Sequence, residues 1–233
     1  NDTPGVMLSS AAKVYANRYG VAVGKAPALM ASHDSGWHDV FALAKAGISI
    51  SAIIDVRDSV DSALMREADR LGIPVYLNHG VVGVRGRHGV SSIDICNYGD
   101  QRVHRVDADA LLMAGGWTPS VHLWSHSKGS LAWRDDIGAY VPDQPNENVR
   151  CVGACSGGWD FGSGAIVDVL PTPKDQSRIK AFVDFQNDVT AKDIKLAVRE
   201  GFRSIEHIKR YTTNGMATDQ GKTSNLNGLQ IAS

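Results

Sequence analysis

The stretch with the most suggestive chemistry is GMATDQGKTSN, residues 215–225, in which Gly-Lys-Thr follows a run of small polar residues. A phosphate-binding loop of the Walker type requires G-x-x-x-x-G-K-[S/T] between a strand and a helix, so that backbone N–H groups surround the phosphates. Gly215 and Gly221 are one residue too far apart, a helix is predicted before the loop, and NLNGLQ after it is a poor helix. The pattern therefore argues against a nucleotide hydrolase.

The same loop still carries groups that suit an anion. Lys222, Thr223 and Ser224 supply an ammonium and two hydroxyls, which can donate together to phosphate oxygens. An ordinary solvated surface loop is the competing interpretation, and the chemistry of the residues favours it.

Two helices are predicted before this loop. Thr190 and Asp193 have the spacing of a capping box, Gly201 ends that helix, and Ser204 caps a second helix that stops at Asn214. Two helices joined by a tight turn also suit a helix-turn-helix DNA-binding regulator. The pair is mildly basic, but such a balance usually marks only a solvated face, so DNA binding stays a minor alternative.

The elements that precede the helices predict an α/β fold. Residues 26–56 read as a Rossmann-like βαβ unit, and the alternating apolar residues that follow the next helix indicate an antiparallel meander. The helix over residues 8–18 has no predicted strand before it. We expect four parts: an N-terminal helix and linker (1–20), a second dinucleotide-type domain (21–106), a partial return lobe of the first such domain (107–170), and a small helical C-terminal module (171–233).

Composition excludes several classes of partner. The 233 residues include 24 basic and 25 acidic side chains, so no overall field attracts nucleic acid or an anionic membrane. No apolar run approaches the length of a membrane span, and three cysteines make no disulfide framework. We expect a cytoplasmic protein with no nucleic-acid or membrane partner, and Cys151 and Cys155 as ordinary buried thiols.

The turn of the βαβ unit lacks the glycines that bring backbone close to a pyrophosphate. Ser32, His33 and Asp34 stand there, and a carboxylate at Asp34 repels phosphate charge. Asp55, at the end of the second strand, is placed to accept from a ribose hydroxyl or to cap a helix. We interpret this nucleotide site as vestigial.

Residues 181–225 resemble domains of the bacterioferritin-associated-ferredoxin type, in which four cysteines hold a [2Fe–2S] cluster. Asp184, Gln186, Asp219 and Ser224 occupy those four positions. Because none of them is a thiolate, we expect no [2Fe–2S] cluster here.

This cysteine-free version resembles the alpha-subunit family of heterotetrameric sarcosine oxidases, as do ALMASHDSGWHDVFALAKAGISISAIIDV, DADALLMAGGWTPSVHL and NVRCVGACSGG more loosely. The resemblance implies an oxidoreductase that converts sarcosine to glycine, formaldehyde and peroxide and passes its one-carbon unit to tetrahydrofolate. It also implies NAD, an FMN shared with a beta subunit, and gamma and delta subunits. The Gly-rich N-terminal lobe and the folate-binding domain of that family are missing, so we expect an internal fragment that is inactive alone.

The resemblance implies two cofactor contacts. The residues that it implies for contact with NAD are Gly153, Ala154, Trp159 and Phe161. Tight packing of strand and helix is the alternative explanation for small and aromatic residues at these positions. The contact with FMN at the beta subunit falls on Lys222, Thr223 and Ser224. No catalytic residue and no metal ligand is predicted. An opine, proline or hydroxyproline dehydrogenase alpha subunit is the alternative enzyme.

Overall fold

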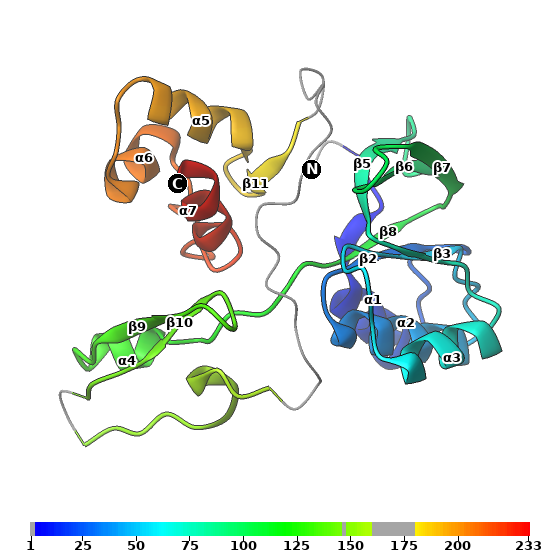
Figure 1. Ribbon diagram of the computed structural model, residues 1–233, viewed down its shortest axis with the longest axis horizontal. Coiled ribbons are helices and arrows are strands. Elements are labelled where there is room, and N and C mark those ends of the chain that lie inside the picture. The colour runs from blue at the N-terminus through cyan, green and yellow to red at the C-terminus, as the bar shows by residue number, and fades with distance from the viewer. Residues whose placement is uncertain (1–2, 146–147, 160–179) are drawn as a thin grey trace. The chain divides into compact units, whose positions relative to one another are not determined.

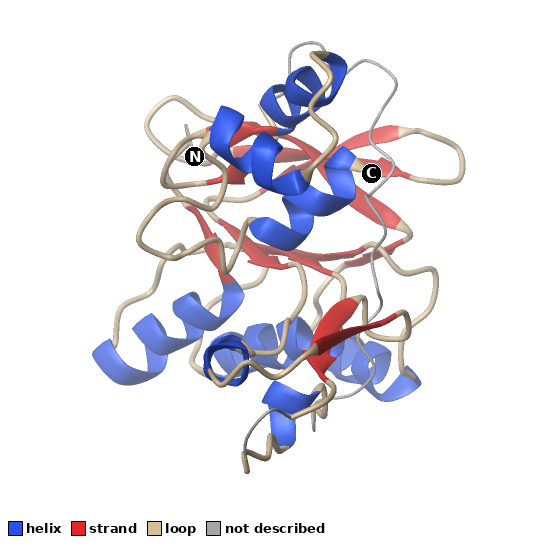
Figure 2. Ribbon diagram, turned by 90° about the vertical axis from the view of Figure 1, so that its left-hand side faces the viewer, coloured by secondary structure: helices blue, strands red, loops and turns tan. Residues whose placement is uncertain are grey.

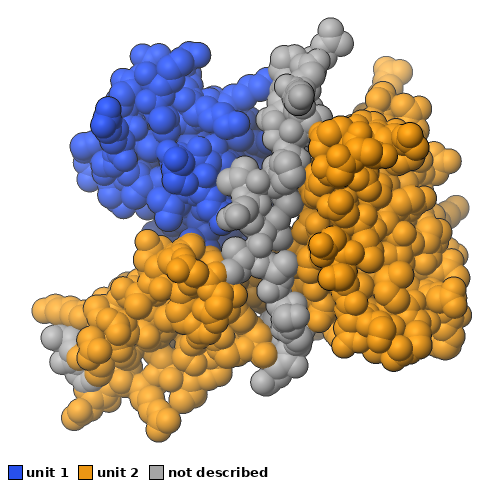
Figure 3. All heavy atoms as spheres, in the orientation of Figure 1, with its two compact units in different colours: residues 1–2, 168–233 blue, residues 3–167 orange. Residues whose placement is uncertain are grey.

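The computed structural model describes residues 3–145, 148–159 and 180–233. Its contacts divide the chain into two units, residues 3–167 and residues 168–233 with the first two residues (Figure 3). We call the first the sheet unit and the second the tail module, and describe each by itself. The expected boundary at residues 171–176 lies outside the described residues, and the finer division of the chain stays a prediction.

A five-stranded parallel sheet forms the centre of the sheet unit, in the strand order β1-β8-β2-β3-β4 (Figure 1). Its strands are β1 (Val6–Leu8), β2 (Ala28–Ala31), β3 (Ala52–Asp55), β4 (Val75–Leu77) and β8 (Leu111–Ala114). Every residue of β3 is buried, as expected for a strand covered on both faces.

Three helices cover one face of this sheet, namely α1 (Ser9–Tyr19), α2 (Asp34–Lys45) and α3 (Ser62–Arg70). Leu29, Ile53 and Leu112 point into the same core cluster as Trp37 and Leu43 of α2. Gly20, in the left-handed conformation at φ 64°, ends α1 as its sequence predicts.

A three-stranded antiparallel sheet covers the other face, built from β5 (His79–Arg85), β6 (Ser92–Asn97) and β7 (Val103–Asp107). Ile93 and Ile95 of β6 lie in one core cluster with Ala52 and Ile54 of β3. The expected meander is therefore confirmed, and the unit has three layers: helices, parallel sheet and antiparallel sheet (Figure 1).

Three strands differ from the sequence-based expectation. The helix over residues 9–19 does follow a strand, β1, and β7 was not predicted. β8 pairs in parallel with both β1 and β2, so residues 111–114 complete the same sheet as the βαβ unit. β1 has only three residues, and β7 has one buried residue in five. Neither strand therefore shows the alternation of apolar and polar residues that would predict it from sequence.

Residues 115–159 carry α4 (His122–His126), the antiparallel hairpin β9 (Leu131–Arg134) with β10 (Ala139–Pro142), and the 3₁₀ turn η1 (Gly153–Ser156). Trp133 and Tyr140 meet edge to face across the hairpin with ring centroids 5.0 Å apart. Trp124 of α4 is buried and donates from Nε1 to the Ser130 carbonyl at 2.7 Å.

The tail module contains a short hairpin, β11 (Phe182–Asp184) with β12 (Val189–Thr190), and three helices that are blue in Figure 2. These are α5 (Ala191–Arg199), α6 (Ile205–Thr212) and α7 (Asn225–Ala232). Val183, Ile194 and Ile208 lie in its core. The capping box is confirmed, because the Thr190 side chain accepts from the backbone N–H of Asp193 and Asp193 Oδ2 accepts from the backbone N–H of Thr190 at 2.8 Å.

The prediction that residues 225–230 make a poor helix is wrong, since they form most of α7. The helix is held by packing: Ile231 and Ala232 contact the core of the module, and Gly228 is buried. A Cβ on Gly228 would lie 2.7 Å from Asn214 Nδ2, so the glycine permits the close approach. Tertiary contact here outweighs weak helix propensity.

Gly36→Ala tests the packing of α2 on the sheet. A Cβ at this position would lie 2.6 Å from the Ala114 Cβ, a short side chain that cannot turn away. We expect a loss of about 1–3 kcal/mol in the free energy of unfolding from urea titration, as for other overpacked cores. Gly115→Ala, where a Cβ meets nothing within 4 Å, is the matched control. Equal stability of the two variants would contradict the packing role.

Candidate cofactor sites

At the carboxyl end of the parallel sheet, Asp55 is fully buried, and both of its carboxylate oxygens accept hydrogen bonds. Trp37 Nε1 donates to Asp55 Oδ2 at 2.7 Å, and Arg57 donates its Nη2 to the same oxygen at 2.8 Å. The backbone N–H and Nε of Arg57 donate to Oδ1 at 2.9 and 3.0 Å. The carboxylate expected to accept from a ribose is thus engaged within the chain.

Arg57 joins this carboxylate to the start of α2. Its Nη1 lies 2.6 Å from Asp34 Oδ1, in the first turn of the helix where a pyrophosphate would need backbone N–H groups. Burial opposes the charged guanidinium, but hydrogen bonds to Asp55 and then Asp34 hold the pKa of Arg57 above its ordinary value. The chain therefore supplies both an anion at the helix start and the cation that balances it.

One side of this ion-pair network is formed by His33, Ser35 and Trp117. Ser35 Oγ lies 2.7 Å from His33 Nδ1 and accepts from Trp117 Nε1 at 2.9 Å. Burial, followed by the nearby charge of Arg57, lowers the pKa of His33, which favours the neutral imidazole. The sequence analysis identified Asp34 and Asp55 but missed Arg57 and Trp117.

The residues predicted to line an NAD site lie around η1. Gly153 has φ +68°, and a Cβ there would meet nothing within 4 Å, so its backbone is open to a ligand. Ala154 is exposed and Trp159 is half-buried. Phe161 lies outside the described residues. The structure therefore brings Gly153 and Ala154 together on an open turn, and the NAD contact itself stays a prediction.

In the tail module, Asp184 holds the four-residue turn of the hairpin and a distant loop together. This carboxylate is only 2% exposed. Its Oδ1 accepts from the backbone N–H groups of Gln186 and Asn187, both at 2.9 Å, and its Oδ2 accepts from that of Gly215 at 2.7 Å. Although burial works against the charged form, these backbone hydrogen bonds lower the pKa of Asp184.

Gln186 makes a second tie between the same two segments. Its side-chain carbonyl accepts from the backbone N–H of Thr218 at 2.9 Å and from the Thr218 hydroxyl at 2.7 Å. Asp219, the third of the positions where the resemblance places cysteine, bonds within its own loop, to Gly221 N and Thr223 Oγ1 at 3.2 and 3.1 Å. Oxygen acceptors at these positions thus fix the hairpin turn to the loop over residues 215–218.

The predicted FMN contacts are not equivalent in the structure. Lys222 is exposed, and Thr223 is exposed but donates its hydroxyl to Asp219. Ser224 is fully buried, and its hydroxyl has no hydrogen-bond partner among the described residues. Ser224 therefore does not present a donor at the surface beside Lys222.

The described parts of the chain lack two features, a metal-binding cluster and a membrane-spanning helix. Within residues 3–145, 148–159 and 180–233, no group of three or more His, Cys, Asp or Glu side chains is arranged to hold a metal ion. No helix among these same residues has the length and apolar character needed to cross a membrane.

The parallel sheet with helices on one face and an antiparallel sheet on the other places the chain in the α/β dinucleotide-binding class of folds. The structure of L-proline dehydrogenase from P. horikoshii is similar over 100% of this chain and 49% of that chain, with a TM-score of 0.62 and 20% identity. That likeness establishes the fold.

Matches of higher sequence identity link the chain to one group of enzymes. Residues 178–233 match the sarcosine oxidase A3 domain. The chain is 37% identical to the sarcosine oxidase subunit alpha of Rhizobium meliloti (strain 1021) and 34% identical to that of Corynebacterium sp. (strain P-1), each over 99% of this chain. It spans about a quarter of the length of these relatives, 26% and 28% respectively. Along nearly its whole length the chain is thus similar to a segment of the sarcosine oxidase alpha subunits.

Asp55→Ala tests whether the ion-pair network is structural. Removing this carboxylate leaves Arg57, only 11% exposed, with part of its charge unbalanced. We expect the sheet unit to lose about 3 kcal/mol or more in urea unfolding followed by tryptophan fluorescence. Arg70→Ala, which removes an exposed pair with Glu67, should leave the midpoint close to wild type. A small effect of Asp55→Ala would show that the network contributes little.

Asp184→Asn tests whether the Asp184 carboxylate holds the hairpin turn to the loop at Gly215, through the pH dependence of the stability of the module. The folded-state pKa of Asp184 is lowered, so its stabilisation is complete above its unfolded pKa of about 3.9 and is lost as pH falls through the lower folded value. Native-state hydrogen exchange at Ile194 and Ile208 reports opening of the module core. We expect the variant to open more easily by about 2 kcal/mol at pH 6, with a smaller difference at about pH 3. A difference independent of pH would contradict a charged acceptor.

Proposed function

We propose that the chain forms part of the alpha subunit of a flavin-dependent sarcosine oxidase. The overall reaction is sarcosine, oxygen and water to glycine, formaldehyde and hydrogen peroxide, with the one-carbon unit passed to tetrahydrofolate when it is present. The similarity along 99% of the chain to sarcosine oxidase alpha subunits is the observation that carries this proposal. We also propose a cytoplasmic location and beta, gamma and delta subunits as partners.

Within that enzyme, the turn at Gly153 and Ala154 is our candidate for NAD binding. The absence of a side chain at Gly153 and the open space around it fit the approach of a dinucleotide. The alternative site beside Asp34 and Asp55 fits poorly, because Arg57 already occupies both carboxylates. A nucleotide there would have to displace buried ion pairs.

The tail module, in this proposal, contacts the FMN of the beta subunit through Lys222. A flavin bound at this interface would supply the oxidation of the amine, and this chain would supply an ammonium group toward its phosphate. Asp184 and Gln186 hold the loop that carries Lys222 by their bonds to Gly215 and Thr218. The donor set at the four positions where the resemblance places cysteine contains no thiolate, so a conventional [2Fe–2S] cluster does not fit this module.

The described residues offer binding and positioning groups rather than a catalytic set. Their buried carboxylates are saturated with hydrogen bonds, and no three metal-binding side chains converge among them. We therefore expect the chain to have no oxidase activity without the flavin-bearing subunit.

Lys222→Glu in the assembled enzyme tests the interface. Reversing this charge should lower the amount of flavin retained on gel filtration, measured from the flavin absorbance per mole of protein. Ser224→Ala is the matched control: its hydroxyl is buried without a partner, so its removal should leave flavin retention unchanged. Equal flavin content in the Lys222→Glu variant and wild type would count against the contact.

An opine, proline or hydroxyproline dehydrogenase is the second candidate, since the fold is shared with L-proline dehydrogenase along the whole chain. Assays of one purified complex with sarcosine and with L-proline separate these candidates. Oxidation of L-proline without oxidation of sarcosine would overturn the first proposal.

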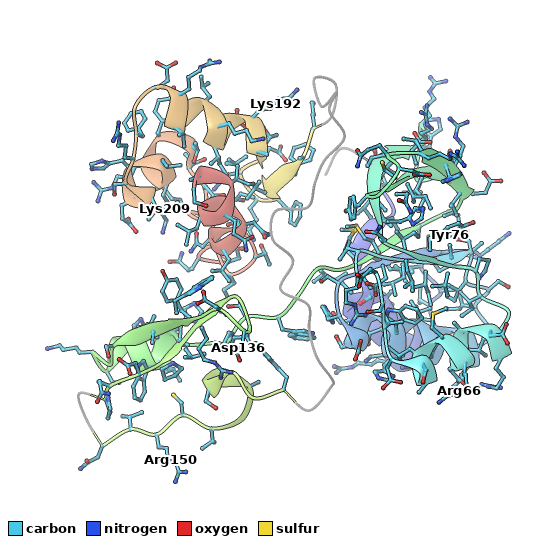
Figure 4. All side chains as sticks on the ribbon, in the orientation of Figure 1. Arg66, Tyr76, Asp136, Arg150, Lys192 and Lys209 are labelled. Carbon is cyan, nitrogen blue, oxygen red and sulfur yellow. The ribbon has the colours of Figure 1, made fainter. Side chains whose placement is uncertain are left out.

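DNA binding is the candidate from a different class. The basic side chains of the two helices include Lys192 on α5 and Lys209 on α6 (Figure 4). The same helices lie within the matched sarcosine oxidase A3 domain, so the oxidase proposal accounts for them and we do not propose a DNA partner.

A further inference from the structure

Two of the three cysteines lie close together in sequence, Cys151 two residues before the 3₁₀ turn η1 and Cys155 within it. They are separated by Val152, Gly153 and Ala154, and the Cys155 thiol is near enough to contribute to the raised pKa of Cys151. The Cys155 thiol also lies 3.1 Å from the Val152 carbonyl, which shows that its side chain turns back toward the preceding residues. Both cysteines are free and only partly buried, contrary to the expectation that they are buried thiols.

The turn is anchored on one side and open on the other. A Cβ on Gly157 would lie 2.9 Å from Ile137 Cδ1 and 3.0 Å from Val141 Cγ1, so this end packs closely on the β9–β10 hairpin. Val152 is 66% exposed, and Gly153 has free space around it. A small oxidant can therefore reach the thiols, and the backbone at Gly153 has room to adjust as they join.

We propose that Cys151 and Cys155 form a reversible intramolecular disulfide when the chain meets a hydroperoxide. The sulfur of Cys155 attacks one peroxide oxygen, the O–O bond breaks, and a sulfenic acid forms while the released hydroxide takes the thiol proton to give water. The sulfur of Cys151 then attacks the sulfenic sulfur, the S–O bond breaks, and a second water leaves. Two electrons pass from the thiols to the peroxide, and the disulfide is the oxidised product.

The order of the two thiols follows from their surroundings. Desolvation, and then the neighbouring Cys155 thiol, raises the pKa of Cys151. Because the thiolate rather than the thiol is the nucleophile, a raised pKa slows a first attack by Cys151, and the proposal therefore assigns that step to Cys155. Cys96 is 2% exposed within β6 and serves as an internal reference that peroxide should not reach.

The biological source of the oxidant rests on the proposed function, because an oxidase releases hydrogen peroxide close to its own subunits. The thiol chemistry does not rest on it. Added hydrogen peroxide tests the disulfide even if the enzyme proves to be a dehydrogenase, so the two proposals can fail separately.

The test uses the full chain, reduced, freed of reductant and treated with hydrogen peroxide while folded. Remaining thiols are then alkylated in denaturant, and the protein is digested with trypsin. Cleavage after Arg150 (labelled in Figure 4) and Lys174 releases residues 151–174, which contain both cysteines and not Cys96. We expect this peptide to be unalkylated and lighter by two hydrogen atoms, and to become doubly alkylated if dithiothreitol is added first.

Single variants check the mechanism. Cys151→Ser should stop at a sulfenic acid on Cys155 that dimedone traps, and Cys155→Ser should react with peroxide more slowly than wild type. Recovery of residues 151–174 doubly alkylated after peroxide treatment would overturn the proposal, as would cross-linking to Cys96 or between chains. A disulfide that forms equally fast at Cys96 would show general oxidation rather than a specific site.

Discussion

A buried carboxylate is stable in a protein only when hydrogen-bond donors surround it, and this constraint shapes both units of the chain. Asp55 meets it with Arg57 and Trp37, and Asp184 meets it with three backbone N–H groups. Each carboxylate draws together segments that are separated in sequence, the end of β3 and the start of α2 in one unit and two loops in the other. The local geometry of both regions follows from satisfying one buried charge.

The two arrangements also share a consequence for ligands. Near Asp55 the start of α2 carries its own anion, Asp34, with Arg57 between the carboxylates. In the tail module, amide and carboxylate oxygens at residues 184 and 186 bind the loop over residues 215–218 directly. In both places internal contacts already occupy the polar groups, and the residues of the two proposed cofactor contacts, Gly153 and Lys222, are exposed elsewhere in the chain.

Sequence reasoning predicted the parts whose signals are local. The βαβ unit, the antiparallel meander and the capping box at Thr190 follow from periodicity and from spacing within four residues. β1 was missed because three residues show no period, and α7 because its stability comes from contact with α5 and the module core rather than from propensity. Arg57 was missed because its two partners become neighbours only when β2 and β3 pair in register.

The candidate site residues also differ in how far their environment could be predicted from local sequence. Ser224 looked equivalent to Lys222 in sequence, yet one is buried and the other exposed, because the loop turns between them. Of the four positions where the resemblance places cysteine, Asp184, Gln186 and Asp219 accept hydrogen bonds, while the Ser224 hydroxyl has no partner among the described residues. Serine is the residue closest in shape to cysteine. At this position packing rather than a hydrogen bond encloses the side chain, whereas hydrogen bonds fix the side chains at the other three.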